Sequence, residues 1–497
     1  MGEGCKLIDS HIIKPKSLKL NFALNTTRTV LNFLVPVIIF PYVSRILGPD
    51  GLGKVDFANS IVSYFALFTA LGIPVYGMRE IARVRDDEKL RSQTVCELAV
   101  ILAITVCAGY LIYIVLINFV PQMENQKKLF LIVAPTIFLS SFSFDWFYQG
   151  IENQTYITVR YIIVKLTQIV CIFLLVKSRG HFLRYAAIAV GMSGVSTFFN
   201  ITHLRRFVHL VPVKELDITR HIKLILIVFA SLVAVSIYMH LDVTMLGFFC
   251  SDANVGFYTA ANRLVRIVIM LVTALSAVIV PRLENCLERG DNASYLRYLN
   301  LSLHYILLLA LPCCFGVIAL APDIITIFAG EKYFESIKTI RLLSPIVIIV
   351  GLANFVGLQI LYPHRQEWKY TFSVTVAAIV NACFNAILIP KFAQNGAAIG
   401  TLIAEGLGFL FQVIFAWRYL LETDFFSFNT VKYIVAGIGM YVVLSVIPND
   451  GRNLLVHCVM CVLIAALVYG VILIVCREKL LLDSLKRFFF RRKTISL

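Results

Sequence analysis

The sequence predicts an all-α integral membrane protein with about 14 transmembrane helices. The chain has 497 residues, of which 59% are hydrophobic and 15% are charged. Soluble domains carry about 25% charged residues on average, so this composition argues against a soluble enzyme. The connections between apolar segments are short, at most about 20 residues, and none can hold a folded extramembrane domain of ordinary size.

Fourteen apolar segments follow one another along the chain, each close to the roughly 20 residues that a helix needs to cross the hydrocarbon core. In order, they are residues 20–43, 57–78, 93–118, 129–148, 157–176, 184–204, 224–249, 257–280, 299–320, 340–360, 371–389, 396–417, 431–447 and 454–475. The first begins after a short polar stretch without a cleavage site, which indicates an uncleaved signal anchor.

The basic residues predict the orientation of these segments. The chain holds 45 Lys and Arg against 29 Asp and Glu, a net charge of +16. With both ends in the cytoplasm, 29 of the 45 cations lie on the cytoplasmic side and 12 on the outer side, with loop-proximal residues counted in the loops. Because cytoplasmic loops are enriched in Lys and Arg, cytoplasmic N- and C-termini are expected. The charge then reports topology and gives no reason to expect nucleic acid as a partner.

Two short motifs about 200 residues apart predict an internal repeat. LGKVDFAN at 52–59 and VGFYTAAN at 255–262 align on Gly53 and Gly256, and both enter an apolar segment. Six segments per half fit this offset and give the halves the same orientation, related by an axis along the membrane normal. The expected organisation is a cytoplasmic N-terminus at 1–19, an N-lobe at 20–223, a C-lobe at 224–425, two further helices at 426–475 and a basic cytoplasmic tail at 476–497.

Four cations fall inside the apolar segments. Arg28 and Arg266 each lie about nine residues into a segment, roughly 13 Å deep at 1.5 Å per residue, while Arg263 is one helical turn from Arg266 and could reach outward. Lys165 could line a cavity or extend to the cytoplasmic face. A guanidinium stays charged when desolvated and binds phosphate in a bidentate manner. Cavity-lining roles therefore indicate an anionic, phosphate-bearing substrate, whereas structural ion pairs are the alternative.

Polar partners accompany these cations. Asn59 and Asn262 occupy matching places in the repeat, and we group them with the arginines as candidate cavity residues. Three acids are candidates for ion coupling: Asp242, Glu405 and Asp145. Asp242 could pair with Arg263 or bind a proton or Na⁺. Glu405 could instead be a packed acid among glycines, and Asp145 an interfacial residue beside aromatic anchors.

Metal and catalytic chemistry is not expected. The spacing Cys458-x-x-Cys461 beside His457 is like that of a metal site, but no second ligand pair accompanies it. The 12 cysteines are interpreted as small buried hydrophobic residues without structural disulfides. No phosphate-binding glycine loop is present, so neither ATP hydrolysis nor a bound cofactor is predicted, apart from H⁺ or Na⁺ as a coupling ion.

Several stretches resemble the bacterial polysaccharide flippases, the O-antigen and capsule repeat-unit exporters of the MOP superfamily. The resemblance covers about residues 18–480. The stretches are PYVSRILGPDGLG at 41–53, ALGIP at 70–74, GMREIA at 77–82, DWFYQG at 145–150 with Tyr156-Ile157, LDVTMLG at 241–247 and GAAIGTLIAE at 396–405.

The resemblance implies a 14-helix transporter with two six-helix lobes and a cationic cavity. Its expected substrate is an undecaprenyl-pyrophosphate-linked oligosaccharide, moved by alternating access from the cytoplasmic to the periplasmic leaflet of the bacterial cytoplasmic (inner) membrane. The relative that flips the peptidoglycan precursor uses arginines on its first and eighth helices, which match Arg28 and either Arg263 or Arg266 here. A departure is the polar pair Asn262-Arg263, where many members are less polar. Membrane lipids, a polysaccharide polymerase and glycosyltransferases are the implied partners.

Two other functions are weighed against the flippase. A cation-coupled multidrug antiporter of the same superfamily would usually have 12 spans and an acidic N-lobe cavity. A membrane glycan polymerase or glycosyltransferase would usually need a sizeable outer loop with catalytic residues. The span count, the deep arginines and the short loops favour a transporter that is not an enzyme.

Overall fold

The computed structural model describes residues 18–448, 453–478 and 482, and these residues form helices and no strands. The expected cytoplasmic N-terminus and most of the basic tail lie outside the described residues. In the described part, 10 helices are long and apolar enough to cross a membrane, or 11 when the segment interrupted between Val233 and Ser236 counts as one span. The all-α membrane fold is confirmed.

Two long helices each contain an internal break, which explains the lower count. α1 (Leu18–Ala70) is broken at Gly48, where φ is 72° and ψ is 178°. α17 (Glu367–Leu420) is broken at Ala393, where φ is 48° and ψ is −128°. Each break divides a helix that covers two of the expected segments. Together with the shorter apolar helix Thr430–Val446, the divided helices account for all 14 segments.

The helices fall into two compact units, each described here by itself. The first unit contains the chain up to Ile39 and Ala58–Ile237, and the second contains Phe40–Phe57 and the chain from Tyr238 onward. The division falls inside α1 and inside α10 (Thr219–Phe249).

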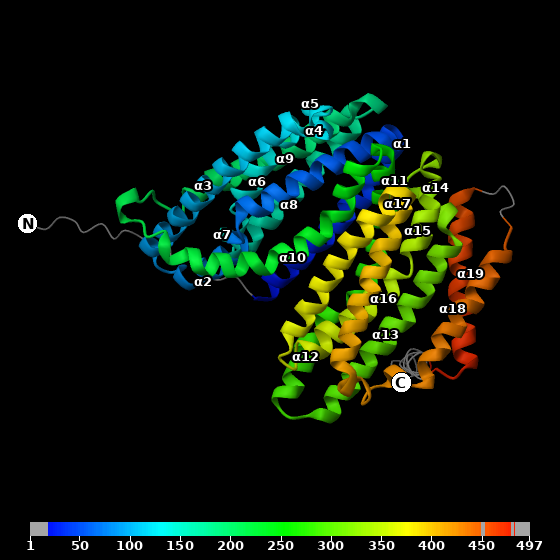
Figure 1. The fold of residues 1–497 in the computed structure, drawn as a ribbon. Helices are drawn as coiled ribbons and strands as arrows, with labels where there is room; N and C mark the ends of the chain where they lie inside the picture. The colour runs from blue at the N-terminus through cyan, green and yellow to red at the C-terminus, as the bar shows by residue number, and fades with distance from the viewer. Residues whose placement is uncertain (1–17, 449–452, 479–481, 483–497) are drawn as a thin grey trace, which may run out of the picture. The chain divides into compact units, whose positions relative to one another are not determined.

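The first unit packs around aromatic residues of its short helices. Trp146 and Phe147 of α7 are buried against Ile73 of α2 and Leu98 of α3. Ile157 of α8 also belongs to this core, and Figure 1 shows the helices of the unit. The helices are α2 (Ile73–Val84), α3 (Glu88–Phe119), α4 (Pro121–Glu124), α5 (Lys127–Val133), α6 (Pro135–Ser141), α7 (Asp145–Gly150), α8 (Gln154–Leu175) and α9 (Phe182–Leu204), with short turns η1 (Arg179–His181) and η2 (Val213–Glu215).

The second unit contains the remaining helices, and its last two, α18 and α19, pack against each other and against α13 (Figure 1, orange, red and green). The elements are α11 (Asp252–Thr273), α12 (Ser276–Glu288), α13 (Asn292–Ala319), α14 (Ala321–Phe328), η3 (Glu331–Tyr333), α15 (Ser336–Leu343), α16 (Ile346–Val356), η4 (Gly357–Leu361), α17, η5 (Asp424–Phe426), α18 (Phe428–Val446) and α19 (Leu454–Val475).

The two glycines that define the sequence repeat lie against each other in the second unit. A Cβ on Gly53 would be 1.7 Å from the carbonyl oxygen of Asp252 and 2.9 Å from the nitrogen of Gly256. A Cβ on Gly256 would be 2.1 Å from the carbonyl oxygen of Pro49. Only glycine permits this backbone-to-backbone approach, so the repeated motif marks a crossing of α1 with α11.

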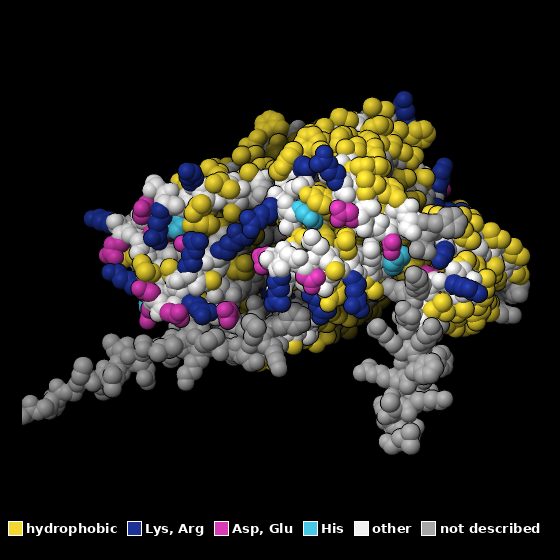
Figure 2. All heavy atoms as spheres, turned by 90° about the horizontal axis from the view of Figure 1, so that it is seen from below, with side chains coloured by type: hydrophobic (Ala, Val, Ile, Leu, Met, Phe, Trp, Pro, Cys, Tyr) yellow, Lys and Arg dark blue, Asp and Glu magenta, His cyan; other side chains and the backbone are white. Residues whose placement is uncertain are grey.

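The surface fits a membrane protein. On the face drawn in Figure 2, hydrophobic side chains form broad areas, and Lys, Arg, Asp and Glu gather elsewhere. Large apolar side chains on the spanning helices are half or more exposed, among them Leu111 (68%), Leu463 (66%) and Leu467 (67%). In water this exposure would be unfavourable, whereas in lipid it is the expected surface of a spanning helix.

Candidate functional site

Asp242 is the centre of a buried polar cluster in the second unit. It lies on α10, and only 8% of the residue is exposed. Its Oδ1 accepts hydrogen bonds from the amides of Asn381 (3.1 Å) and Asn385 (2.6 Å). Its Oδ2 accepts from the Thr401 hydroxyl (2.9 Å) and from the Tyr258 hydroxyl. A carboxylate in the membrane is costly unless polar groups surround it, and here four side chains do so.

The broken helix α17 supplies three of these four side chains. Asn381 and Asn385 are one turn apart and share a helix face, while Thr401 follows the break at Ala393. The two parts of α17 pack closely here, because a Cβ on Gly400 would be 2.3 Å from Asn385 Oδ1. That same Oδ1 is buried and has no hydrogen-bond partner among the described residues. The cluster therefore offers several oxygens and one unused acceptor, a donor set that suits a hard cation.

In the structure Asp242 does not pair with Arg263, so the ion pair considered from the sequence is excluded. The Arg263 guanidinium lies 2.5 Å from Asp56 Oδ1 and over the Phe40 ring, 5.2 Å from its centroid. Asp56 is 10% exposed and also accepts the Thr259 hydroxyl at 2.7 Å. Asp56 belongs to the second unit and lies against α11.

Arg266 differs from Arg263 in its surroundings. Its side chain is exposed, and Nη1 lies 3.6 Å from the sulfur of Met239. No carboxylate lies within ion-pair distance of Arg266 among the described residues. Its charge acts electrostatically on Glu405 and His240. Glu405 in turn accepts a hydrogen bond from the Tyr238 hydroxyl at 2.7 Å. The second unit therefore groups Arg266, Glu405 and the Asp242 cluster.

The first unit holds the other candidate cations. Arg28 of α1 is half-buried and acts electrostatically on Tyr161 of α8. Lys165 lies 5.8 Å from the centre of the Tyr161 ring and donates to Gln168 Oε1 at 2.9 Å. Asn59 is exposed in this unit, whereas Asn262 is half-buried in the second unit.

Asp145 is in a structural ion pair at the start of α7. Its Oδ1 lies 2.7 Å from the guanidinium of Arg160 and 2.8 Å from the amide of Asn200. Arg160 is 7% exposed and Asp145 39% exposed. These contacts join α7, α8 and α9. They favour a structural role for Asp145 over ion coupling.

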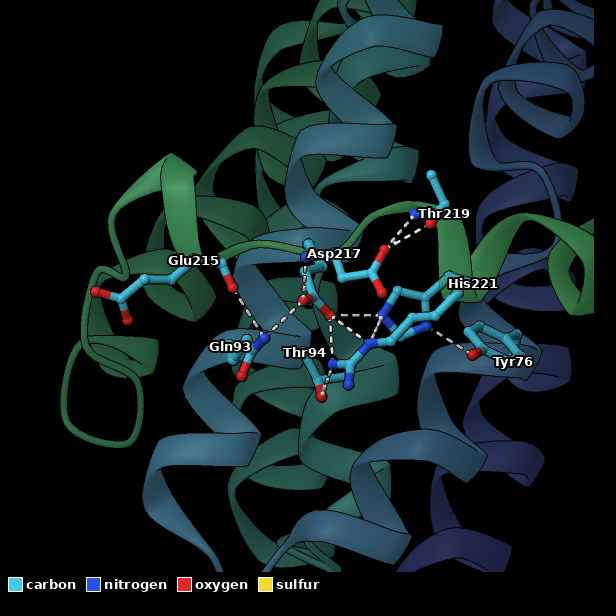
Figure 3. Close-up of polar contacts among 9 residues, drawn as sticks. Tyr76, Gln93, Thr94, Glu215, Asp217, Thr219 and His221 are labelled. Carbon is cyan, nitrogen blue, oxygen red and sulfur yellow. Dashed lines mark hydrogen bonds and ion pairs between the residues drawn. The ribbon is translucent and has the colours of Figure 1, made fainter.

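A second buried carboxylate, Glu97 of α3, is absent from the sequence-based candidates. Glu97 is fully buried and accepts hydrogen bonds from His221 Nε2 (2.7 Å), Arg220, Gln93 and the backbone of Asp217 (Figure 3). The His221 ring also meets the Tyr76 hydroxyl at 2.6 Å.

The segment that precedes α10 is therefore fixed to α3. Asp217 in this segment accepts the Thr219 hydroxyl and backbone N–H, which lower the pKa of its carboxyl. Glu97 is an acid inside the apolar segment 93–118, and this position could have identified it from the sequence as a buried carboxylate in need of partners.

No group of three or more His, Cys, Asp and Glu side chains in the described residues could hold a metal ion. Cys461 contacts His457 Nε2 at 3.6 Å, and His457 Nδ1 lies 3.0 Å from Asp323. The described cysteines are free, but only Cys314 and Cys461 among them are buried, so the interpretation of the cysteines as buried hydrophobic residues is corrected for the others.

Helical spans broken beside buried polar clusters define a multi-pass membrane protein of the transporter type. The family described as polysaccharide biosynthesis protein matches residues 18–286, more than half of the chain. The chain belongs to this family.

Curated relatives carry transporter and flippase names. A putative O-antigen transporter of Escherichia coli (strain K12) is 23% identical over 384 residues, which cover 76% of this chain and 91% of that protein. A putative O-antigen transporter of Shigella dysenteriae is 24% identical over 394 residues, 77% of this chain and 96% of the other. A probable low-salt glycan biosynthesis flippase of Haloferax volcanii is 24% identical over 210 residues, 42% of each chain.

Solved structures show the same fold. The lipid II flippase MurJ in an inward closed conformation matches with a TM-score of 0.71 and 18% identity, over 93% of this chain and 99% of that chain. A multidrug resistance MATE family transporter of the MOP superfamily, inward-facing, matches with a TM-score of 0.63 and 15% identity, over 80% and 98%.

Proposed function

We propose that this protein is a flippase that moves a polyprenyl-pyrophosphate-linked oligosaccharide across the bacterial cytoplasmic membrane for surface polysaccharide biosynthesis. The observation that carries the proposal is the family membership, together with O-antigen transporters whose length this chain covers almost completely. A multidrug antiporter is supported by likeness of fold alone. A polymerase or glycosyltransferase has no support among the relatives' names. Both termini would lie in the cytoplasm, and the polymerase and glycosyltransferases would act on the same lipid-linked glycan.

Arg266 is the residue of the second unit best suited to contact the pyrophosphate. Its neighbour Arg263 is already neutralised by Asp56, so a phosphate would have to compete with that carboxylate. Arg266 is exposed and lies near a sulfur atom instead of an acid. In the first unit Arg28 would fill the corresponding role, with Lys165 near the ring of Tyr161. Asn59 and Asn262 would contact the sugars through their amides.

Asp242 is the proposed coupling site, with Na⁺ as the coupling ion. Its carboxylate would be joined by the oxygens of Asn381, Asn385 and Thr401 once the two side-chain amides turn by about 180° to present oxygen in place of nitrogen. The unused Asn385 Oδ1 supports this role, because a cation would supply the missing partner. Glu405 would connect the part of α17 that follows the break to α10, through its hydrogen bond with Tyr238. A proton bound to Asp242 is the alternative coupling ion.

The function is tested by complementation of a strain that lacks its own repeat-unit flippase. Wild-type protein should restore surface glycan. Arg266→Ala should reduce it by about tenfold or more, and Arg266→Lys should restore only part, because an ammonium cannot bind phosphate in a bidentate manner. Arg289→Ala is the matched control, since that arginine is exposed at the end of α12.

Two results would contradict the proposal. Normal glycan with Arg266→Ala at a normal protein level would remove the arginine from the substrate site. Failure of wild-type protein to restore glycan, combined with a gain in drug tolerance, would favour the antiporter.

A further inference from the structure

A pocket of about 470 Å³ lies between α8 and α9 in the first unit. Its wall has two chemically different parts. One part is polar and lies at the beginning of α8, where Thr155, Arg160 and His203 line the pocket. The other part is apolar and runs along both helices through Val159, Ile163 and Phe199.

The polar part contains three buried groups that no described residue satisfies. Arg160 is 93% buried, and its Nε has no hydrogen-bond partner, although Nη2 donates to Asp145 and Nη1 to the carbonyl of Ser196 at 3.3 Å. The Thr155 hydroxyl and His203 Nδ1 are also buried without a partner. Unsatisfied buried polar atoms are rare and usually indicate a missing ligand or water.

The beginning of α8 adds a preference for negative charge. No side chain caps this helix, and its first turn holds no acidic residue. The first N–H groups of the helix therefore remain available, and the helix dipole favours an anion at this end. Asp145 offsets the charge of Arg160, but Arg206 acts electrostatically on both Tyr156 and His203. Arg160 and Arg206 together with the helix dipole outweigh the single negative charge of Asp145, so the polar part favours an anion.

The apolar part opens toward the bilayer. Val159 is 49% exposed, Ile163 58% and Phe199 49%, and all three lie on helices that are long and apolar enough to cross the membrane. Because α8 begins beside the polar part, this part lies near the membrane surface, at the depth of lipid phosphates. A ligand here has a phosphate at one end and hydrocarbon at the other.

We propose that this pocket binds one anionic phospholipid of the surrounding bilayer. Its phosphate accepts hydrogen bonds from Thr155, Arg160 Nε and the first N–H groups of α8. Its acyl chain lies over Val159, Ile163 and Phe199. The site is separate from the flipped cargo, since the bound lipid stays in its own leaflet.

Native mass spectrometry of the detergent-purified protein, titrated with phosphatidylglycerol or phosphatidylcholine, tests this proposal. The wild type should retain one phosphatidylglycerol and bind phosphatidylcholine about tenfold more weakly. Thr155→Val should weaken phosphatidylglycerol binding about tenfold or more, which corresponds to one lost hydrogen bond to a charged group. Val159→Trp should fill the apolar part and abolish the bound lipid.

Two control variants use the same helix. Thr167→Val removes an exposed hydroxyl that bonds only its own helix at Ile163. Val170→Trp adds a tryptophan at a site 54% exposed, three turns along nearly the same face. Both should bind phosphatidylglycerol like the wild type, and all variants should keep the wild-type melting temperature in lipid-free detergent.

Four results would overturn the proposal. They are equal binding of the two lipids, retention of the lipid by Val159→Trp, its displacement by inorganic phosphate alone, and binding of a polyprenyl phosphate in place of phosphatidylglycerol. The third would mean that only an anion is bound, and the fourth that the pocket serves the cargo lipid.

Discussion

At the scale of single residues, three acids with little exposure in the described part of the chain each have hydrogen-bond donors beside them. Asp242 receives two amides and two hydroxyls, Asp56 an arginine and a hydroxyl, and Glu97 a histidine and an arginine. A buried carboxylate without such partners would be strongly unfavourable. Of these three clusters, the Asp242 cluster has a buried, unused acceptor, on Asn385. The Asp145 ion pair also has one, on Asn200, so the candidate binding site rests on the unused acceptor together with the several oxygens gathered around Asp242.

The Glu97 network should contribute to stability. Glu97→Gln removes the charge while keeping the shape, so the hydrogen bonds from Arg220 and His221 become weaker by about 2 kcal/mol in total. Thermal unfolding in detergent should show a lower melting temperature. The control is Glu88→Gln on the same helix, where the acid is 53% exposed beside His209 and should matter by less than about 1 kcal/mol. Equal melting temperatures for the two variants would contradict a stabilising role.

The sequence identifies which charges are buried but not which of them meet. Asp242 stands out because an acid inside an apolar segment is costly, and Asn381 with Asn385 shows one-turn spacing that could have indicated a polar helix face. The pairing of Arg263 with Asp56 joins residues 207 positions apart. No periodicity encodes such a distance. The sequence therefore left a pair of Asp242 with Arg263 open as one of two alternatives, and in the structure Arg263 bonds Asp56 instead.

At the scale of elements, the 14 expected apolar segments are present, but two breaks were not anticipated. At Gly48 the chain uses the positive φ that glycine adopts without strain. At Ala393 a residue with a Cβ takes φ of 48°, which tertiary contacts must impose. The sequence-based segments end at 43 and 389 and resume at 57 and 396 because they follow hydropathy. The residues between them are nevertheless helical on both sides of each break.

The crossing of α1 with α11 should be sensitive to a single methyl group. Gly256→Ala places a Cβ 2.1 Å from the Pro49 carbonyl oxygen, and backbone atoms cannot move aside as a side chain does, so a loss of about 3 kcal/mol is expected. Gly406→Ala on α17 is the matched control. No atom lies within 4 Å of its new Cβ, and a helical alanine should stabilise by about 0.5 kcal/mol. A melting curve of each variant compares them, and an unchanged Gly256→Ala would refute the close crossing.

At the scale of the whole molecule, composition predicts the class and spacing predicts the count of spans. Two lobes of six helices remain a prediction, since the compact units divide α1 and α10 and do not follow the segment boundaries. The orientation from 29 against 12 cations likewise remains a prediction.

Coupling is a property of the whole transporter, and it gives a direct binding experiment. If Na⁺ binds at Asp242, NaCl should raise the melting temperature relative to KCl, by about 2.7 kcal/mol of stabilisation at 100 times the Kd. Asp242→Asn should remove this difference. Asp50→Asn should keep it, because Asp50 is 63% exposed and pairs with Lys54. A melting temperature that depends on pH and is equal in the two salts would assign a proton to Asp242 instead.

The boundary between the two compact units falls within α10, between Ile237 and Tyr238, close to the Asp242 cluster. The carbonyl of Ile237 accepts a hydrogen bond from Tyr64 in the first unit, and the next side chain, Tyr238, donates to Glu405 in the second. Asp242 follows one turn later, about 6 Å along the axis. One helical turn of α10 therefore separates the residue at which the two units divide from the proposed coupling site. If an ion binds at Asp242, it contacts the same turn of helix that carries Tyr238, and its effect on the boundary residue needs no other part of the protein.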